Sequence, residues 1–104
     1  MTDHQIYVLV GEAEKYRDRD AFVSDATLSH QMEHLEIPEA AEKAGIIWDA
    51  VNLPFSALRS SMNLTQAQMA ERLCAPRRTV ENWEYRNTCP VYIRLLIARV
   101  WLGL

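Results

Sequence analysis

Side chains that can read nucleic-acid bases gather on one face of an expected helix over residues 77–85. Arg77 and Arg78 stand at its N-terminus, and Asn82 lies one turn further along the same face. Arginine pairs bidentately with guanine O6 and N7, and asparagine with adenine N6 and N7. Glu81 lies on this face too, where it either accepts from cytosine N4 or repels phosphate. The pattern predicts contact with base edges in the major groove of DNA.

Two short helices joined by a tight turn are needed to position these side chains. The first is expected over residues 65–73, because Thr65 and Gln68 have the spacing of a capping box. Residues 74–76 form the turn, which makes the pair a helix-turn-helix unit whose second helix enters the groove. Gln66, in the first turn of the first helix, is then placed to bond a phosphate. The side chains expected in the core of this unit are Met69, Leu73, Val80 and Trp83.

The segment LRSSMNLTQAQMAERLCAPRRTVENWE resembles the XRE family of Cro/CI-type helix-turn-helix repressors. The resemblance covers about residues 58–90, with its recurrent positions in register at Leu58, Arg59, Leu64, Thr65, Gln66, Ala70, Leu73, Thr79, Val80, Trp83, Glu84 and Pro90. It implies a five-helix DNA-binding domain in residues 53–104 of an all-α protein. It also implies a dimer that binds an inverted repeat in double-stranded DNA and regulates transcription, most simply as a repressor.

The same resemblance assigns individual roles. It aligns Arg77, Arg78 and Asn82 with base-reading positions, and it implies a structural ion pair between Arg59 and Glu84. The residues that it places at or near phosphate contacts are Gln66, Thr79, Tyr85, Arg86 and Asn87.

Three residues, Asn63, Cys74 and Arg86, stand where that family has glycine. Asn63 is the residue other than glycine that tolerates the left-handed conformation at a helix end. Cys74 is expected to be a small buried hydrophobe. Arg86 adds a possible phosphate contact.

The N-terminal region, residues 1–52, is expected to be helical and resembles no domain of known activity. Residues 5–16 fit either a helix capped by Asp3 or a short buried strand, and we favour the helix. A second helix is expected over 20–35, capped by Asp18 or Asp20, and a third follows Pro38 over 39–51. The remaining helices are expected over 55–62 and 91–104, separated from the first three by a boundary at 52/53.

Charge divides the 104-residue chain into the same two parts. Residues 1–52 hold 4 basic and 11 acidic side chains, a balance of −7, whereas residues 53–104 hold 7 arginines and 3 acids, a balance of +4. An acidic half joined to an arginine-rich half is typical of an anion-binding unit with a separate partner surface. The acidic residues 1–52 would then serve dimerisation or bind a basic protein partner.

Two other functions fit the same pattern. In one, the protein is an antitoxin that regulates its own operator while residues 1–52 grip a basic toxin. In the other, it is a protein-interaction module with a vestigial DNA motif, which the overall charge of −3 slightly favours. Enzyme activity is not expected, because no arrangement of acid, base and nucleophile emerges.

Neither a metal nor a cofactor is expected. His30 and His34 have an i, i+4 spacing that can hold a metal, but no third ligand is placed nearby. Cys74 and Cys89 form no CxxC pair, and two cysteines suit a reduced, cytoplasmic protein. No apolar run approaches the ~18 residues of a membrane span, and no signal peptide is evident.

The last expected helix is apolar around much of its circumference, at Ile93, Leu95, Leu96, Ile97, Val100, Trp101, Leu102 and Leu104. A helix that is apolar on more than one face must be buried on more than one face. Its second face is therefore covered either by residues 1–52 or by another subunit.

Overall fold

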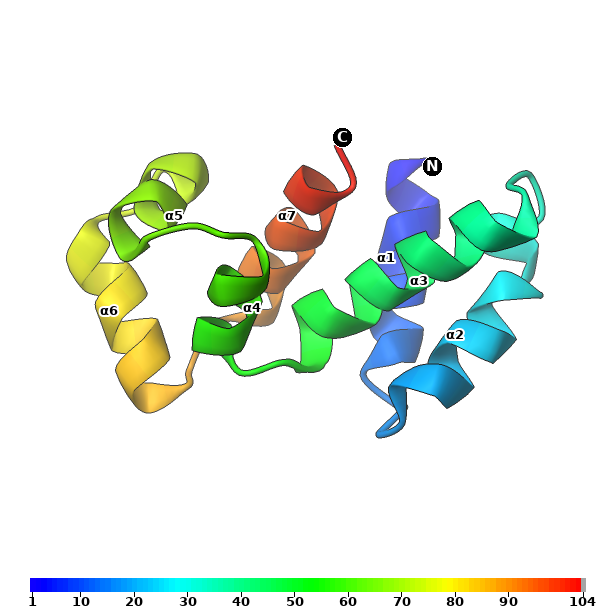
Figure 1. Ribbon diagram of the computed structural model, residues 1–104, viewed down its shortest axis with the longest axis horizontal. Coiled ribbons are helices and arrows are strands. Elements are labelled where there is room, and N and C mark those ends of the chain that lie inside the picture. The colour runs from blue at the N-terminus through cyan, green and yellow to red at the C-terminus, as the bar shows by residue number, and fades with distance from the viewer. Residues whose placement is uncertain (104) are drawn as a thin grey trace.

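The computed structural model describes residues 1–103, which form seven α-helices and one 3₁₀ turn without a strand (Figure 1). The all-α prediction is therefore confirmed. No helix within the described residues is long and apolar enough to cross a membrane. The elements are α1 (Asp3–Ala13), α2 (Arg19–Thr27), η1 (His30–Met32), α3 (Ile37–Asn52), α4 (Phe55–Ser61), α5 (Gln66–Leu73), α6 (Arg77–Arg86) and α7 (Val91–Trp101).

The ambiguous N-terminal segment is a helix, α1, which begins at Asp3 and ends at Ala13, before the expected end at residue 16. Thr2, rather than Asp3, is its N-cap, and Thr2 and Gln5 form a reciprocal capping box with hydrogen bonds of 3.1 and 2.8 Å. One face of α1 is buried, through Ile6, Leu9, Val10 and Ala13. The capping box and this apolar stripe together select the helix over the strand.

The expectation of one helix over residues 20–35 is wrong. Helix α2 ends at Thr27, and the chain turns through Ser29, whose hydroxyl donates to the carbonyl of Ala26 at 2.6 Å. A serine that bonds a nearby carbonyl competes with continued helix. The turn that follows buries Met32 completely. His30 and the exposed His34 consequently share no helix, so their expected i, i+4 register is lost.

Two apolar clusters form the core, one in each half of the chain. The N-terminal cluster lies among α1, α2, η1 and α3, with Phe22 and Ile47 buried in it. The C-terminal cluster lies among α4, α5, α6, α7 and the last turn of α3, with Ala50, Phe55 and Val80 buried in it. Residues 53–103 hold four helices, one fewer than the resemblance implies.

Helix α7 belongs to both clusters. Its Ile97 and Ala98 are buried in the C-terminal cluster, whereas Leu95 and Leu102 pack against the N-terminal one. It packs on α3 and α1 as well as on α5. The second apolar face of α7 was expected to be covered by residues 1–52 or by another subunit, and in the structure residues 1–52 cover it. The helix ends at Trp101, so the expected run over 91–104 is too long, and Leu104 lies outside the described residues.

Polar contacts fasten the halves to each other. Arg94 of α7 donates from Nη1 to the carbonyls of Ala50 (2.9 Å) and Leu53 (2.8 Å), where α3 ends. A guanidinium at this position satisfies carbonyls that the helix leaves unpaired and complements its dipole. Arg99 of α7 also pairs with Asp3 of α1 at 2.7 Å.

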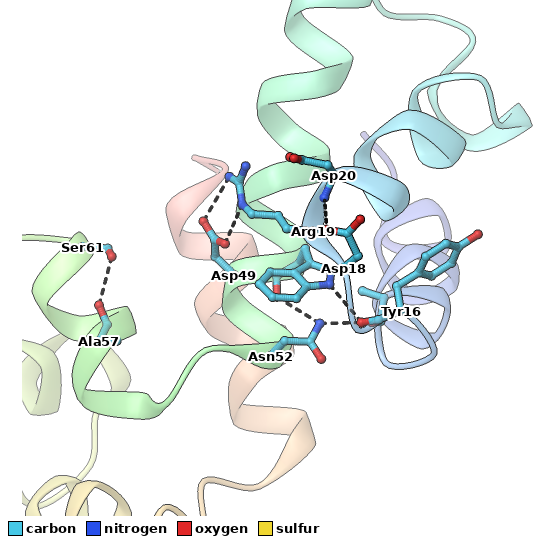
Figure 2. Close-up of polar contacts among 10 residues, drawn as sticks. Tyr16, Asp18, Arg19, Asp20, Asp49, Asn52, Ala57 and Ser61 are labelled. Carbon is cyan, nitrogen blue, oxygen red and sulfur yellow. Dashed lines mark hydrogen bonds and ion pairs between the residues drawn. The ribbon is translucent and has the colours of Figure 1, made fainter.

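Within the N-terminal half, Arg19 of α2 crosses to Asp49 of α3, with hydrogen bonds of 2.8 and 3.2 Å (Figure 2). Gly45 leaves room for this crossing, because a Cβ there would meet the end of the Arg19 side chain and the guanidinium would have to shift. Asn52 donates to the carbonyl of Ala13 at 3.0 Å, which ties the end of α3 to the end of α1.

Candidate nucleic-acid interface

Helices α5 and α6 pack against each other across a three-residue turn. The reciprocal capping box of Thr65 and Gln68 is present at the start of α5, with bonds of 3.1 and 2.9 Å. Helix α5 ends at Leu73, and the left-handed backbone of the next residue, Cys74 (φ 52°), lets Ala75 N–H donate to the carbonyl of Ala70 at 2.9 Å. Pro76 then precedes the first residue of α6. The turn sequence thus sets where α6 begins.

Cys74 is exposed, and the expectation that it is buried is wrong. A residue in the left-handed conformation at a helix end turns the chain away from the helix, and here its side chain faces solvent. Asn63, between α4 and α5, is also left-handed (φ 56°), which fits its expected role.

The expected core of the unit is largely present. Met69 and Val80 are buried, and Leu73 and Trp83 are half-buried against the same cluster. Phe55 of α4 packs edge-on against Trp83, with ring centroids 5.6 Å apart. These contacts fix the inner face of α6 and thereby the direction of its outer face.

The outer face of α6 carries most of the expected base-reading and phosphate-binding side chains. Thr79 is half-buried on the flank of the helix. Tyr85 is 89% exposed. The remaining residues on this face, all exposed, are Arg77, Arg78, Glu81, Asn82 and Arg86. Helical periodicity explains the grouping, since residues four apart lie on one face.

This face is basic. Arg77 Nε lies 3.2 Å from Glu81 Oε1 within α6, which leaves the two terminal nitrogens of Arg77 outside that contact. Within residues 1–103, Arg78 and Arg86 form no ion pair, and neither does Arg72 in the last turn of α5. Because the fold does not neutralise these three guanidinium groups, they are free to attract an anion.

Beneath this face, Glu84 links three helices. It pairs with Arg59 of α4 and accepts from Gln66 Nε2 of α5 at 2.9 Å. Arg59 also donates to the carbonyl of Leu64 at 2.9 Å. Burial acts to raise the pKa of Glu84, but the hydrogen bonds from Arg59 and Gln66 outweigh it and hold that pKa below its ordinary value.

Gln66 therefore has a structural bond besides its expected phosphate contact. A carboxamide nitrogen carries two hydrogens, so one donor of Gln66 remains after the bond to Glu84. The ion pair that the resemblance implies between Arg59 and Glu84 is present in the structure.

The two ends of α6 are well separated. At a rise of 1.5 Å per residue, Arg77 and Arg86 stand about 14 Å apart along the axis. Asn87, the residue after the helix, caps it in the left-handed conformation (φ 50°) and is exposed. Arg86 and Asn87 thus lie a full turn beyond Asn82, where they can reach a different part of a ligand.

Helix α6 lies at one end of the molecule, and α2 lies at the other (Figure 1). The chain measures 40 × 25 × 22 Å, so the acidic lobe of α1, α2 and α3 is displaced along the longest axis from α6. The outer face of α6 is not covered by that lobe.

No group of three possible metal ligands occurs among the described residues. The thiol of Cys89 is half-buried, and this burial raises its pKa to about 11, so it is protonated at neutral pH. Sequence reasoning gave no role to Arg72, an exposed arginine in the last turn of α5. Its only signal was membership in the arginine-rich half.

Comparisons with known proteins add no identification. No protein-family model matches the chain, and neither a curated protein nor a solved structure is significantly similar to it.

Proposed function

We propose that this protein is a sequence-specific regulator that binds double-stranded DNA through α6, as the XRE-like motif implies. The observation that carries the proposal is the outer face of α6. Arg77, Arg78 and Asn82 project from it at one end of the molecule, while the opposite face is fixed by Val80 and Trp83.

In this proposal α6 enters the major groove, and its first two turns meet the bases. Arg77 and Arg78 pair with guanine, and Asn82 pairs with adenine. Glu81 either accepts from a cytosine amino group or excludes bases that offer it no donor.

The flanking phosphates are held by a second set of donors. Gln66 and Thr79 act near the start of α6, where the helix dipole also favours an anion. Tyr85, Arg86 and Asn87 act at its far end. These contacts would fix the position of α6 on the duplex, and they carry no sequence information themselves.

Two copies on an inverted repeat would increase affinity and place their α6 helices about one helical turn of DNA apart. Occupying such a site blocks other proteins from it, so repression needs no chemistry from this chain.

Random-site selection with the purified protein is the direct test. We expect a recovered inverted repeat that contains guanine and adenine at fixed positions. On that site, Arg78→Ala should weaken binding by about 1–3 kcal/mol and relax the preference at one base pair.

Arg17→Ala is the matched control, because Arg17 is an exposed arginine in the acidic half. Affinity measured by fluorescence anisotropy should be unchanged by Arg17→Ala and should fall steeply with salt for every variant. A double Arg77→Ala, Arg78→Ala protein that binds as tightly as the original would refute the assignment, as would a selection that returns no preferred sequence.

A further inference from the structure

An apolar groove runs between α1 and the first turns of α7, and none of the residues that line it belongs to the DNA-reading face proposed above. It encloses about 670 Å³ and is open to solvent. Tyr7 on α1 and Tyr92 on α7 line it and are 68% and 67% exposed, and the half-buried Leu95 of α7 lines it too. Exposed tyrosines beside a preformed apolar hollow are typical of binding surfaces.

Gly11 lines this groove within α1. Glycine in a helix interior is less stable than alanine. Nothing in the chain requires it here, because an added Cβ would meet no atom within 4 Å. Because Gly11 has no side chain, the groove stays open along the backbone of α1. Another segment can therefore approach this backbone closely.

The rim of the groove is acidic. Glu12 and Glu14 line it together with Lys15, which lies 3.7 Å from Glu12. An adjoining pocket of about 290 Å³ shares Val8 and Glu12 with the groove and adds Asp25. Asp25 also accepts a hydrogen bond from the Tyr16 hydroxyl at 2.6 Å. With Glu12 beside Lys15, the combined surface holds three carboxylates and one ammonium group, and Glu14 is the carboxylate of the groove that lies outside these contacts. Two copies of this surface would repel each other, whereas a basic segment would be attracted.

We propose that this groove binds a basic amphipathic helix of another protein. The apolar face of that helix would lie against Tyr7, Tyr92 and Leu95, and its lysines or arginines would reach Glu12, Glu14 and Asp25. Helix-in-groove binding of this kind uses apolar anchors at i, i+3, i+4 and i+7 on the incoming helix. Since α7 forms one wall, the partner would touch both halves of the chain at once.

The probe for this proposal is a fluorescein-labelled 18-residue peptide of leucine and lysine in an amphipathic helical pattern. We expect saturable binding by fluorescence anisotropy, and no binding of a leucine–glutamate peptide with the same pattern. Gly11→Leu should weaken binding at least roughly tenfold, because its side chain fills the groove. Glu14→Gln should weaken it roughly two- to fivefold, as expected for one exposed ion pair.

Gly11→Ala is the matched control, since a methyl group leaves most of the groove free and should change binding less than roughly twofold. Circular dichroism checks that both Gly11 variants fold. Equal binding of the peptide to the original and Gly11→Leu proteins, or no binding at all, would overturn the proposal. So would a dimer in sedimentation equilibrium that Gly11→Leu dissociates, because a second copy would then occupy the groove. None of these outcomes depends on DNA binding.

Discussion

The two halves of the molecule use their charged side chains differently. In the acidic half, Arg19 is held by Asp49, and Asp18 caps α2. In the arginine-rich half, Arg59 is held by Glu84 beneath α6, while Arg78 and Arg86 project outward and form no ion pair within residues 1–103. The basic outer face of α6 is thus not required by the fold. A charge that the fold does not use is available to a ligand.

The same comparison explains why the halves stay together although their surfaces differ. Their apolar clusters share α3 and α7, and Arg94 bonds the carbonyls at the end of α3. The halves therefore differ in how their surface charges are used, although α3 and α7 belong to the apolar clusters of both.

The largest expected effect comes from removing a large buried side chain from one of the two apolar clusters. We expect Phe22→Ala and Phe55→Ala each to lower the free energy of unfolding by about 3–5 kcal/mol. Because α3 and α7 serve both clusters, Phe22→Ala should also speed amide hydrogen exchange at Val80, as measured by NMR. If Phe22→Ala sped exchange only in residues 1–52, the halves would be independent units, contrary to this account.

A smaller effect is expected at the junction itself. Arg94→Met keeps the aliphatic part of the side chain and removes two charged hydrogen bonds to carbonyls, so stability should fall by about 2–3 kcal/mol. Urea denaturation followed by circular dichroism measures this loss. Arg72→Met, at an exposed arginine without an ion pair in the described part of the chain, should change stability little. Equal losses in the two variants would show that the junction bonds contribute nothing.

The smallest expected effect concerns Glu84, a charged residue that lies beneath the outer face of α6 and not on it. The pKa of Glu84 is below its ordinary value of 4.5 in the folded protein, so its network stabilises the fold above that pH. This contribution should be lost as pH falls below about 4.5 and through the lowered folded pKa. Thermal melts should therefore place Glu84→Gln about 1–2 kcal/mol below the original protein at pH 7, with the gap closing in acid.

Glu71→Gln is the control for that experiment, because Glu71 is an exposed carboxylate on α5. Its melts should follow those of the original protein at every pH. A gap for Glu84→Gln that stays constant from pH 7 into acid would contradict the role of the ionised carboxylate.

Local signals were enough to predict much of the C-terminal half. The capping box of Thr65 and Gln68 located the start of α5, and Asn63 and Asn87 fall at left-handed helix ends as their residue type suggests. The outward grouping of Arg77, Arg78 and Asn82 follows from helical period alone. These features depend on residues within a few positions of one another.

Features that depend on distant partners were not predictable in this way. The break after Thr27 is favoured by burial of Met32 in a core built from three other helices. Arg94 reaches carbonyls 44 and 41 residues earlier in the chain, and no local pattern indicates such a bond. The exposure of Cys74 follows from the direction of a turn rather than from its hydrophobicity.

The participation of α7 in both apolar clusters has a consequence for biosynthesis. Small domains commonly begin to fold while still attached to the ribosome, from the N-terminus onward. Here neither cluster is complete until α7, which is translated after every other described helix, has emerged. Until α7 has been translated, both apolar clusters therefore leave part of their surface uncovered on the nascent chain.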